Sequence, residues 1–294
     1  MNKALKKLQL RAVRGMFALA SRAAPGATGR YLARRFVTPA AAGRGNAADA
    51  MVHANDVRRD TLSIRGENIA TYVWGDPVRS PYVLLGHGWS SYALRFSRWI
   101  PRLRAAGYAV VAFDQAAHGL SSGRASSLVH FVDVTRQIGR RFGRPAAFVG
   151  HSLGATAIAF AEEEDWRPSR FVLIAPMANT TEGAWRIFRT LGVAAKAFSS
   201  FEDWLSERSN GARFDDYHAS LRVPHIDRPA LIIHDRFDRE TPWEDGALYA
   251  RLWPGARLFT TEALGHNRMV DHAAVIDEAM AFLGTANTVE PLHS

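Results

Sequence analysis

The chain has 294 residues, 47% of them hydrophobic, which is enough for one large α/β domain. It contains no cysteine, so disulfides, thiolate chemistry and cysteine-ligated metal sites are excluded. The formal net charge is +9, but residues 1–50 carry ten Lys and Arg against one acidic residue, and the rest of the chain carries 27 of each sign. The body of the chain is therefore neutral, and we expect no nucleic-acid partner.

The first 50 residues form a basic N-terminal arm. Apolar residues recur at helical spacing over residues 3–23, a second short helix is expected over residues 29–36, and the small, Gly-rich residues 40–46 indicate a linker. No apolar run in the arm is long enough to span a bilayer, and basic residues interrupt what would be the core of a secretory signal. Three interpretations stay open: an arm packed on the body or on a neighbouring subunit, a peripheral membrane anchor, or a removed targeting segment. We expect a cytoplasmic protein, with membrane association through residues 1–50 as the open alternative.

From residue 57 the pattern predicts strands that alternate with helices. Residues 60–65 and 69–74 alternate between polar and apolar side chains, as an antiparallel edge pair does. The later strands are continuous apolar runs separated by helices, which is typical of a mostly parallel sheet covered on both faces. In such sheets, functional sites form at the carboxyl ends of the strands. The expected later strands are 82–85, 109–113, 146–149, 171–174, 231–234 and 257–260, and the expected helices are 94–106, 128–142, 153–161, 243–252 and 270–283.

One of these strand-to-helix junctions carries the sequence Gly150-x-Ser152-x-Gly154. A serine at such a sharp turn projects its hydroxyl, and the flanking glycines avoid side-chain collisions with the neighbouring strand and helix. The start of the following helix directs free N–H groups and a partial positive charge toward the space beside the Ser152 hydroxyl. This junction therefore predicts a nucleophile next to an oxyanion-binding position.

A serine hydroxyl needs a base to take its proton and a third group to orient that base. His266 follows the strand at 257–260 and is the candidate base. Asp235, Asp238 and Glu240 all follow the strand at 231–234, so the residues alone leave the acid open among these three.

Four separated motifs together resemble those of the α/β-hydrolase family, and the order Ser152, Asp238, His266 is that family's order. The resemblance covers about residues 57–285. The motifs are His87-Gly88-Trp89, Asp114-x-x-x-His118-Gly119-x-Ser121, Gly150-x-Ser152-x-Gly154, and Asp238 with Gly265-His266.

This resemblance implies an α/β-hydrolase fold, with a mostly parallel central sheet, helices on both faces and a helical cap insertion. It implies a core made of residues 57–179 and 226–285, a cap at residues 180–225, and the basic arm at residues 1–50 outside both. The cap is rich in aromatic residues. We expect most of them to pack the cap against the body and some to line a pocket that favours apolar groups.

The resemblance also implies roles at the site. Ser152 would be the nucleophile, His266 the base and Asp238 the acid, with Asp235 as the fallback. The backbone N–H of Leu153, and by resemblance that of Trp89, would form the oxyanion hole. Neither a metal nor a cofactor is expected. Four further polar residues are expected to have structural roles, namely His87, Asp114, His118 and His151.

These residues predict a serine hydrolase that cleaves small-molecule carboxylic esters with a hydrophobic moiety through an acyl-enzyme intermediate. Two alternatives stay open. The same triad could carry C–C, amide or perhydrolase chemistry, or the chain could be a non-catalytic ligand-binding or scaffolding protein on a hydrolase fold. Relatives with a carboxylate nucleophile, such as haloalkane dehalogenases and epoxide hydrolases, are disfavoured because position 152 is serine.

Overall fold

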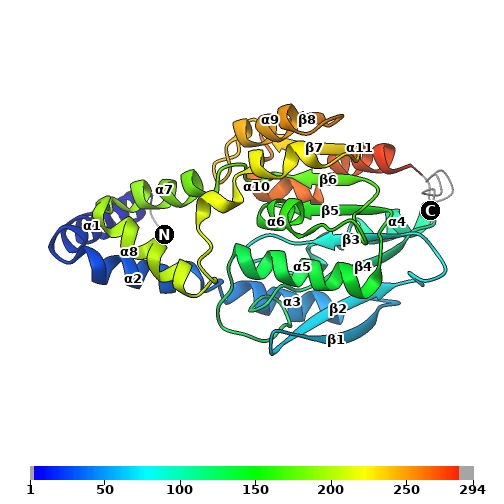
Figure 1. The fold of residues 1–294 in the computed structure, drawn as a ribbon, viewed down its shortest axis with the longest axis horizontal. Helices are drawn as coiled ribbons and strands as arrows, with labels where there is room; N and C mark the ends of the chain where they lie inside the picture. The colour runs from blue at the N-terminus through cyan, green and yellow to red at the C-terminus, as the bar shows by residue number, and fades with distance from the viewer. Residues whose placement is uncertain (1–2, 285–294) are drawn as a thin grey trace. The chain divides into compact units, whose positions relative to one another are not determined.

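The structure is a computed structural model that describes residues 3–284 (Figure 1). The chain divides into two compact units. The helical unit combines the chain up to Thr38 with Asn179–His218, and the α/β unit combines Pro39–Ala178 with the chain from Ala219 onward.

The α/β unit contains an eight-stranded sheet with the strand order β1-β2-β4-β3-β5-β6-β7-β8, and β1 and β8 form its two edges (Figure 1). β1 pairs antiparallel with β2, and β2 antiparallel with β4, whereas all other neighbours are parallel. The predicted antiparallel edge pair and the mostly parallel sheet are therefore confirmed. The strands are β1 (Arg58–Ile64), β2 (Glu67–Trp74), β3 (Tyr82–Gly86), β4 (Ala109–Phe113), β5 (Ala147–His151), β6 (Phe171–Ile174), β7 (Ala230–Asp235) and β8 (Arg257–Thr261).

The central strands are buried on both faces because their side chains alternate between two layers of helices. Val83 and Leu85 of β3 share one apolar cluster with α4 (Ile100–Ala105) and α11 (Ala273–Leu283). Leu84, which points to the opposite face, is fully buried as well. The remaining core helices are α5 (Leu128–Phe142) and α6 (Leu153–Ala161), which pack against each other, and α9 (Trp243–Leu252), which packs on β7 and β8.

The prediction of a linker over residues 40–46 is wrong, because residues 42–46 form the first part of helix α3 (Ala42–Val52). The small residues of α3 allow the helix to pack closely against a neighbouring loop. A Cβ on Gly43 would lie 2.5 Å from the carbonyl oxygen of Ser90, so the helix approaches the loop after β3 more closely than a side chain would allow. The amide of Ala40 donates to the Ser90 hydroxyl at 2.9 Å, which links the segment before α3 to the same loop.

Two predicted helices are each divided in the structure. The helix expected at 94–106 is a 3₁₀ turn (Ala93–Phe96) followed by α4, and Pro101 stands in the first turn of α4, where its missing N–H costs no hydrogen bond. The helix expected at 270–283 is a 3₁₀ turn (Met269–Asp271) followed by α11. The sequence patterns gave no indication of the four-residue helix α10 (Gly265–Arg268).

The helical unit consists of α1 (Lys3–Ala23), α2 (Pro25–Phe36), α7 (Thr180–Leu191) and α8 (Lys196–Glu207), followed by a 3₁₀ turn (Phe214–Tyr217). The backbones of α2 and α8 meet at Gly29, where a Cβ would lie 2.3 Å from the carbonyl oxygen of Ala197. Within this unit, aromatic residues of α7 and α8 form a core with Leu32 and Ala33 of α2. Trp185 and Phe198 stack within that core with ring centroids 4.0 Å apart. Within residues 3–284, no helix has both the length and the apolar character needed to cross a membrane.

Candidate active site

Ser152 occupies the turn between β5 and α6 with φ 53° and ψ −123°, a conformation that is rare for a residue with a side chain. Its amide donates to the carbonyl oxygen of Ile174 in β6 at 2.8 Å, which holds the turn in place. The glycines on either side are sterically required. A Cβ on Gly150 would lie 2.9 Å from Cα of Ala155, and a Cβ on Gly154 would lie 2.3 Å from the carbonyl oxygen of His87.

The fold brings Ser152 together with the predicted base and acid. Oγ of Ser152 lies 2.9 Å from Nε2 of His266 in α10, and Nδ1 of His266 lies 2.7 Å from Oδ2 of Asp238. Asp238 follows the carboxyl end of β7. These distances are those of two consecutive hydrogen bonds, with the imidazole between a hydroxyl and a carboxylate.

The Asp238 carboxylate is fully buried and held on both oxygens. Its Oδ1 accepts the amides of Glu240 at 2.8 Å and Thr241 at 3.0 Å, while its Oδ2 faces His266. Burial raises the pKa of Asp238, but interaction with the imidazoles of His234 and His266 and the Thr241 amide outweighs burial, so the net pKa lies well below the ordinary value. The carboxylate is therefore ionised beside His266 at neutral pH.

The fallback acid, Asp235, has a different set of partners. Its carboxylate accepts the amide of Phe237 at 3.0 Å, the hydroxyl of Thr261 at 2.8 Å and the amide of Leu264 at 2.9 Å. These bonds tie the end of β7 to the loop that follows β8. Asp235 therefore stabilises the loop that carries His266, and of the two aspartates it is Asp238 that bonds to the imidazole.

The two segments proposed to supply the oxyanion donors flank the serine. Leu153 is the first residue of α6, so its N–H is one of those left unpaired at a helix start. A Cβ on Gly88 would lie 2.9 Å from Cβ of Ser152, which places the loop that carries Trp89 directly against the nucleophile. Trp89 itself is half-buried and contacts His118 with ring centroids 5.0 Å apart.

The other polar residues of the motifs brace these loops. Nε2 of His87 accepts the amide of Gln115 at 2.9 Å, and Nδ1–H of His87 donates to the carbonyl of Gly88 at 2.7 Å. Burial lowers the pKa of His87 to about 4, so it is neutral at physiological pH. Asp114 accepts the hydroxyl of Tyr72 at 2.7 Å and the amide of Ala93 at 2.7 Å. These contacts orient the loops after β3 and β4 at the same sheet edge as Ser152.

Sequence reasoning missed two contacts of the candidate base. The buried His151 donates from Nε2 to the carbonyl oxygen of His266 at 3.1 Å and so links the serine turn to α10. Burial and the neighbouring His266 lower the pKa of His151 well below its ordinary value, so it is uncharged. Glu240, considered above only as a candidate acid, places Oε2 3.9 Å from Nε2 of His266. In the sequence, only the position of Glu240 two residues after Asp238 indicates a place near the site. That position does not determine the orientation of the Glu240 side chain.

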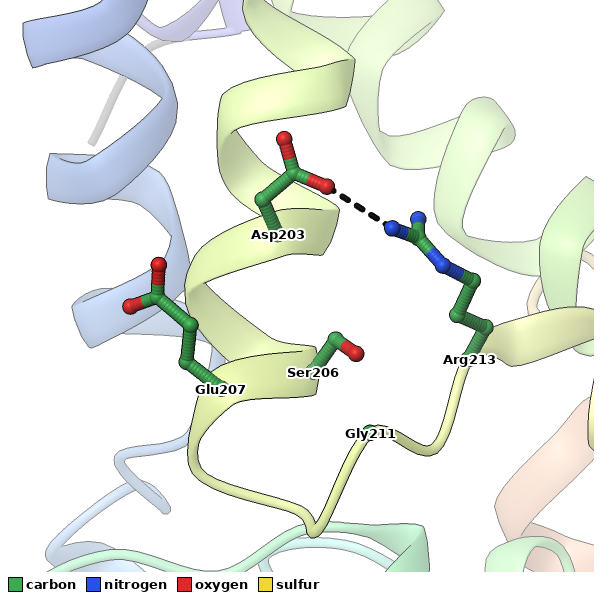
Figure 2. Close-up of a pocket in the computed structure, with 5 residues that line it drawn as sticks. All are labelled: Asp203, Ser206, Glu207, Gly211 and Arg213. Atoms are coloured by element: carbon green, nitrogen blue, oxygen red, sulfur yellow. Dashed lines mark hydrogen bonds and ion pairs between the residues drawn. The ribbon is translucent and has the colours of Figure 1, made fainter.

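A separate pocket of ≈ 420 Å³ lies in the helical unit and is lined by Asp203, Ser206, Glu207, Gly211 and Arg213. Figure 2 shows Asp203 facing Arg213 across it, with Nη2 of Arg213 2.9 Å from Oδ1 of Asp203. It contains none of the residues of the serine site.

Among residues 3–284, no group of three or more His, Asp or Glu side chains is placed to hold a metal ion.

Comparison with known proteins identifies the family of the chain. The model of the Alpha/beta hydrolase family matches residues 82–279, and no curated protein matches the chain. Solved structures with a similar fold include Est816, an N-acyl homoserine lactone degrading enzyme (18% identity, TM-score 0.59, covering 76% of this chain and 99% of that one). They also include the esterase RhEst1 from Rhodococcus sp. ECU1013 (16% identity, TM-score 0.57, covering 78% of this chain and 98% of that one). A third is a membrane phospholipase A described as a bacterial virulence factor (20% identity, TM-score 0.56, covering 95% of this chain and 97% of that one). At these identities the structures show the fold, and the family match covers two thirds of the sequence. The chain therefore belongs to the alpha/beta hydrolase family.

Proposed function

We propose that this protein is a serine hydrolase that cleaves carboxylic esters with a hydrophobic moiety through an acyl-enzyme intermediate. The observation that carries the proposal is the hydrogen-bonded series from Ser152 Oγ through His266 to Asp238, with distances of 2.9 Å and 2.7 Å. The family match and the esterase, phospholipase and lactone-degrading enzyme among its structural neighbours support ester chemistry.

In this proposal His266 Nε2 takes the proton of Ser152 as the hydroxyl attacks the ester carbonyl. Asp238 keeps the imidazole in the tautomer whose Nε2 is a free acceptor and stabilises the imidazolium that forms. The N–H groups of Leu153 and Trp89 receive the oxyanion. His266 then gives its proton to the leaving alcohol, and water, activated by the same imidazole, releases the acyl group. Apart from the water that releases the acyl group, the residues of the site supply every acid, base and nucleophile of this mechanism.

The test is hydrolysis of p-nitrophenyl esters with acyl chains of two to twelve carbons. We expect saturable activity that improves beyond the shortest chain, and a loss of about 10³-fold or more in Ser152→Ala. Full activity in that variant would overturn the assignment. If amide, C–C or peroxide substrates are turned over and esters are not, the triad stands and the ester proposal fails.

We extend the proposal to peripheral membrane contact through residues 1–50. Among residues 9–23 of α1, the part of the helix whose side chains the structure describes, four large apolar side chains are exposed to solvent, namely Leu10, Val13, Met16 at 58% and Leu19 at 72%. The arm carries ten basic residues against one acidic residue, which complements an anionic lipid surface. The membrane phospholipase A among the structural neighbours aligns with 95% of this chain. The enzyme would then work at a lipid surface, where hydrophobic esters are concentrated.

Flotation of the full-length protein with vesicles tests this part separately. We expect binding to vesicles that contain phosphatidylglycerol, weaker binding to pure phosphatidylcholine, and release at high salt. Absence of binding to the anionic vesicles would remove the membrane proposal and leave the hydrolase proposal unchanged.

A further inference from the structure

The start of helix α3 contacts the loop that follows β3, residues 87–92. The amide of Ala40 donates to Oγ of Ser90 at 2.9 Å, and a Cβ on Gly43 would lie 2.5 Å from the carbonyl oxygen of Ser90. Ser90 has φ 55°, a conformation that costs energy for a residue with a side chain and persists only when its surroundings hold it. The start of α3 supplies part of that support.

Arg44 extends this contact to the loop that follows β4. Its Nη1 donates to the carbonyl oxygen of Ser121 at 2.9 Å, and its Nη2 donates to that of Gly123 at 2.8 Å. The hydroxyl of Ser121 donates to the carbonyl oxygen of Asp114 at 2.7 Å, and the Asp114 carboxylate accepts the amide of Ala93 at 2.7 Å. Two routes therefore lead from α3 to the loop after β3, one direct and one through the loop after β4.

The loop after β3 lies against the proposed nucleophile. A Cβ on Gly88 would lie 2.9 Å from Cβ of Ser152. Trp89, whose N–H is proposed above to receive the oxyanion, stands between Gly88 and Ser90. The contacts of α3 with Ser90 are thus one residue from a proposed oxyanion donor. A misplacement of about 1 Å in a catalytic group can lower the rate about 10²-fold, so support at this point bears on catalysis.

Helix α3 lies outside the part of the chain that the family model matches, which begins at residue 82. The last turn of the helix is fixed to the α/β unit, because Ala50 and Met51 pack against the apolar cluster on one face of the sheet. A helix anchored in this way can hold a catalytic loop more precisely than the loop could hold itself.

We propose that Gly43 and Arg44 are positioning residues for the oxyanion hole, which hold the loop after β3 in the conformation that presents the Trp89 N–H to the reacting carbonyl. They act through Ser90 and the loop after β4. The proposal rests on the ester hydrolysis proposed above. It adds a catalytic function for a segment of the basic arm that neither the triad nor the family match explains.

The test compares Gly43→Ala with Gly45→Ala, its matched control two residues further along α3. Both substitutions add one methyl group to the same helix and raise its helix propensity. A Cβ at position 43 collides with the Ser90 carbonyl, whereas a Cβ at position 45 meets no heavy atom within 4 Å. Arg44→Gln, which leaves both glycines in place, is a second and milder variant. Arg44→Lys keeps the charge but loses the paired donors of the guanidinium.

Two quantities are measured for each variant, kcat/KM on p-nitrophenyl butyrate and the Ki of 1,1,1-trifluoropentan-2-one. In the bound ketone, Ser152 Oγ forms a bond to the carbonyl carbon, the serine proton passes to His266, and the ketone oxygen becomes an anion in the oxyanion hole. The Ki therefore reports the oxyanion site. Tm and the folded fraction by circular dichroism are measured in parallel, and the kinetics are expressed per folded molecule.

We expect Gly43→Ala to lower kcat/KM about 10- to 100-fold and to raise the Ki by a similar factor. Arg44→Gln should show the same paired change at about 3- to 30-fold, and Arg44→Lys should recover only part of it. Gly45→Ala should keep the wild-type values.

Wild-type kcat/KM and Ki per folded molecule in Gly43→Ala and Arg44→Gln, whatever their Tm, would overturn the proposal, because α3 would then be structural only. An equal loss in Gly45→Ala and Gly43→Ala would also overturn it. If wild type neither hydrolyses p-nitrophenyl esters nor binds the ketone, the hydrolase proposal itself fails, and the inference fails with it.

Discussion

Asp238→Asn is the substitution whose effect the geometry specifies most closely. Oδ1 of Asp238 faces two backbone N–H donors, from Glu240 and Thr241, whereas Oδ2 faces Nδ1 of His266. In the asparagine variant the amide carbonyl must take the Oδ1 position, because an NH₂ group there would face two donors. The NH₂ group then donates to Nδ1 of His266 and forces the imidazole proton onto Nε2. An Nε2–H facing Ser152 cannot accept the proton of the hydroxyl.

The size of the effect follows from this tautomer. In a serine-protease triad the same substitution lowers kcat about 10⁴-fold, which corresponds to about 5.5 kcal/mol in the barrier. The Asp238 side chain is fully buried, which limits the access of water that could stand in for the lost acceptor. We expect kcat/KM on p-nitrophenyl butyrate to fall about 10³- to 10⁴-fold. The rate of inactivation by a fluorophosphonate should fall in parallel, because both reactions need the deprotonated serine.

Asp235→Asn is the matched control from the same loop. Its carboxylate accepts three hydrogen bonds from Phe237, Thr261 and Leu264, so an NH₂ group must face at least one donor. We expect a loss of about 1–3 kcal/mol in the free energy of unfolding and a lower Tm, with kcat/KM within about tenfold of wild type. If Asp238→Asn stayed within about tenfold of wild type while Asp235→Asn lost about 10³-fold, Asp238 would not be the acid of the triad.

Three further predictions concern stability, the loop after β3 and the basic N-terminal arm. Burial lowers the pKa of His87 to about 4 from 6.5, so the stability gained by keeping it neutral is full above pH 6.5 and is lost as the pH falls through 4. Calorimetry should show Tm falling over that range. If the Tm of His87→Gln fell with pH as steeply as that of wild type, protonation of His87 would not be the cause. A Cβ on Gly88 would lie 2.9 Å from Cβ of Ser152, so Gly88→Ala should lower kcat by about 10- to 100-fold. Gly45→Ala, which meets no heavy atom within 4 Å, should leave kinetics unchanged, and equal losses in both would argue against the steric cause. Met16→Glu and Leu19→Glu should each weaken binding to phosphatidylglycerol vesicles by about 5- to 30-fold with unchanged helicity by circular dichroism, and unaltered flotation would exclude α1 as the contact.

The sheet and the serine turn could be predicted from local sequence because their signals are local. The strand at 171–174 and the helix at 243–252 have the predicted bounds, since a continuous apolar run or helical spacing between turn residues defines each of them. The serine turn is likewise set by its two glycines, whose missing side chains prevent backbone clashes.

The acid could be chosen from the residues only with the help of the family resemblance. Asp235 and Asp238 stand three residues apart in one loop, and both are acids that could follow a strand. What separates them is that backbone amides and Thr261 saturate the Asp235 carboxylate, whereas Asp238 faces the imidazole. Thr261 is the last residue of β8 and His266 lies in α10, so no sequence pattern around residue 235 encodes these two contacts.

Features that depend on packing between distant segments were not predictable. Gly43 resembles a linker residue in the sequence, yet it is buried in α3, where its missing side chain lets the helix approach the loop at Ser90. Similarly, the aromatic residues of α7 and α8 pack on Leu32 and Ala33, about 150 residues earlier in the chain. Composition shows that such residues will be buried but does not show against which partner.

Covalent capture of the acyl-enzyme tests the central claim most directly. The full-length protein is mixed with excess p-nitrophenyl butyrate, quenched in acid within milliseconds to seconds, and analysed by intact-mass and peptide mass spectrometry. We predict a butyryl adduct on Ser152 that forms with the burst of p-nitrophenol and is absent in Ser152→Ala. An adduct on another residue, or turnover by wild type with the same rate in Ser152→Ala, would contradict it.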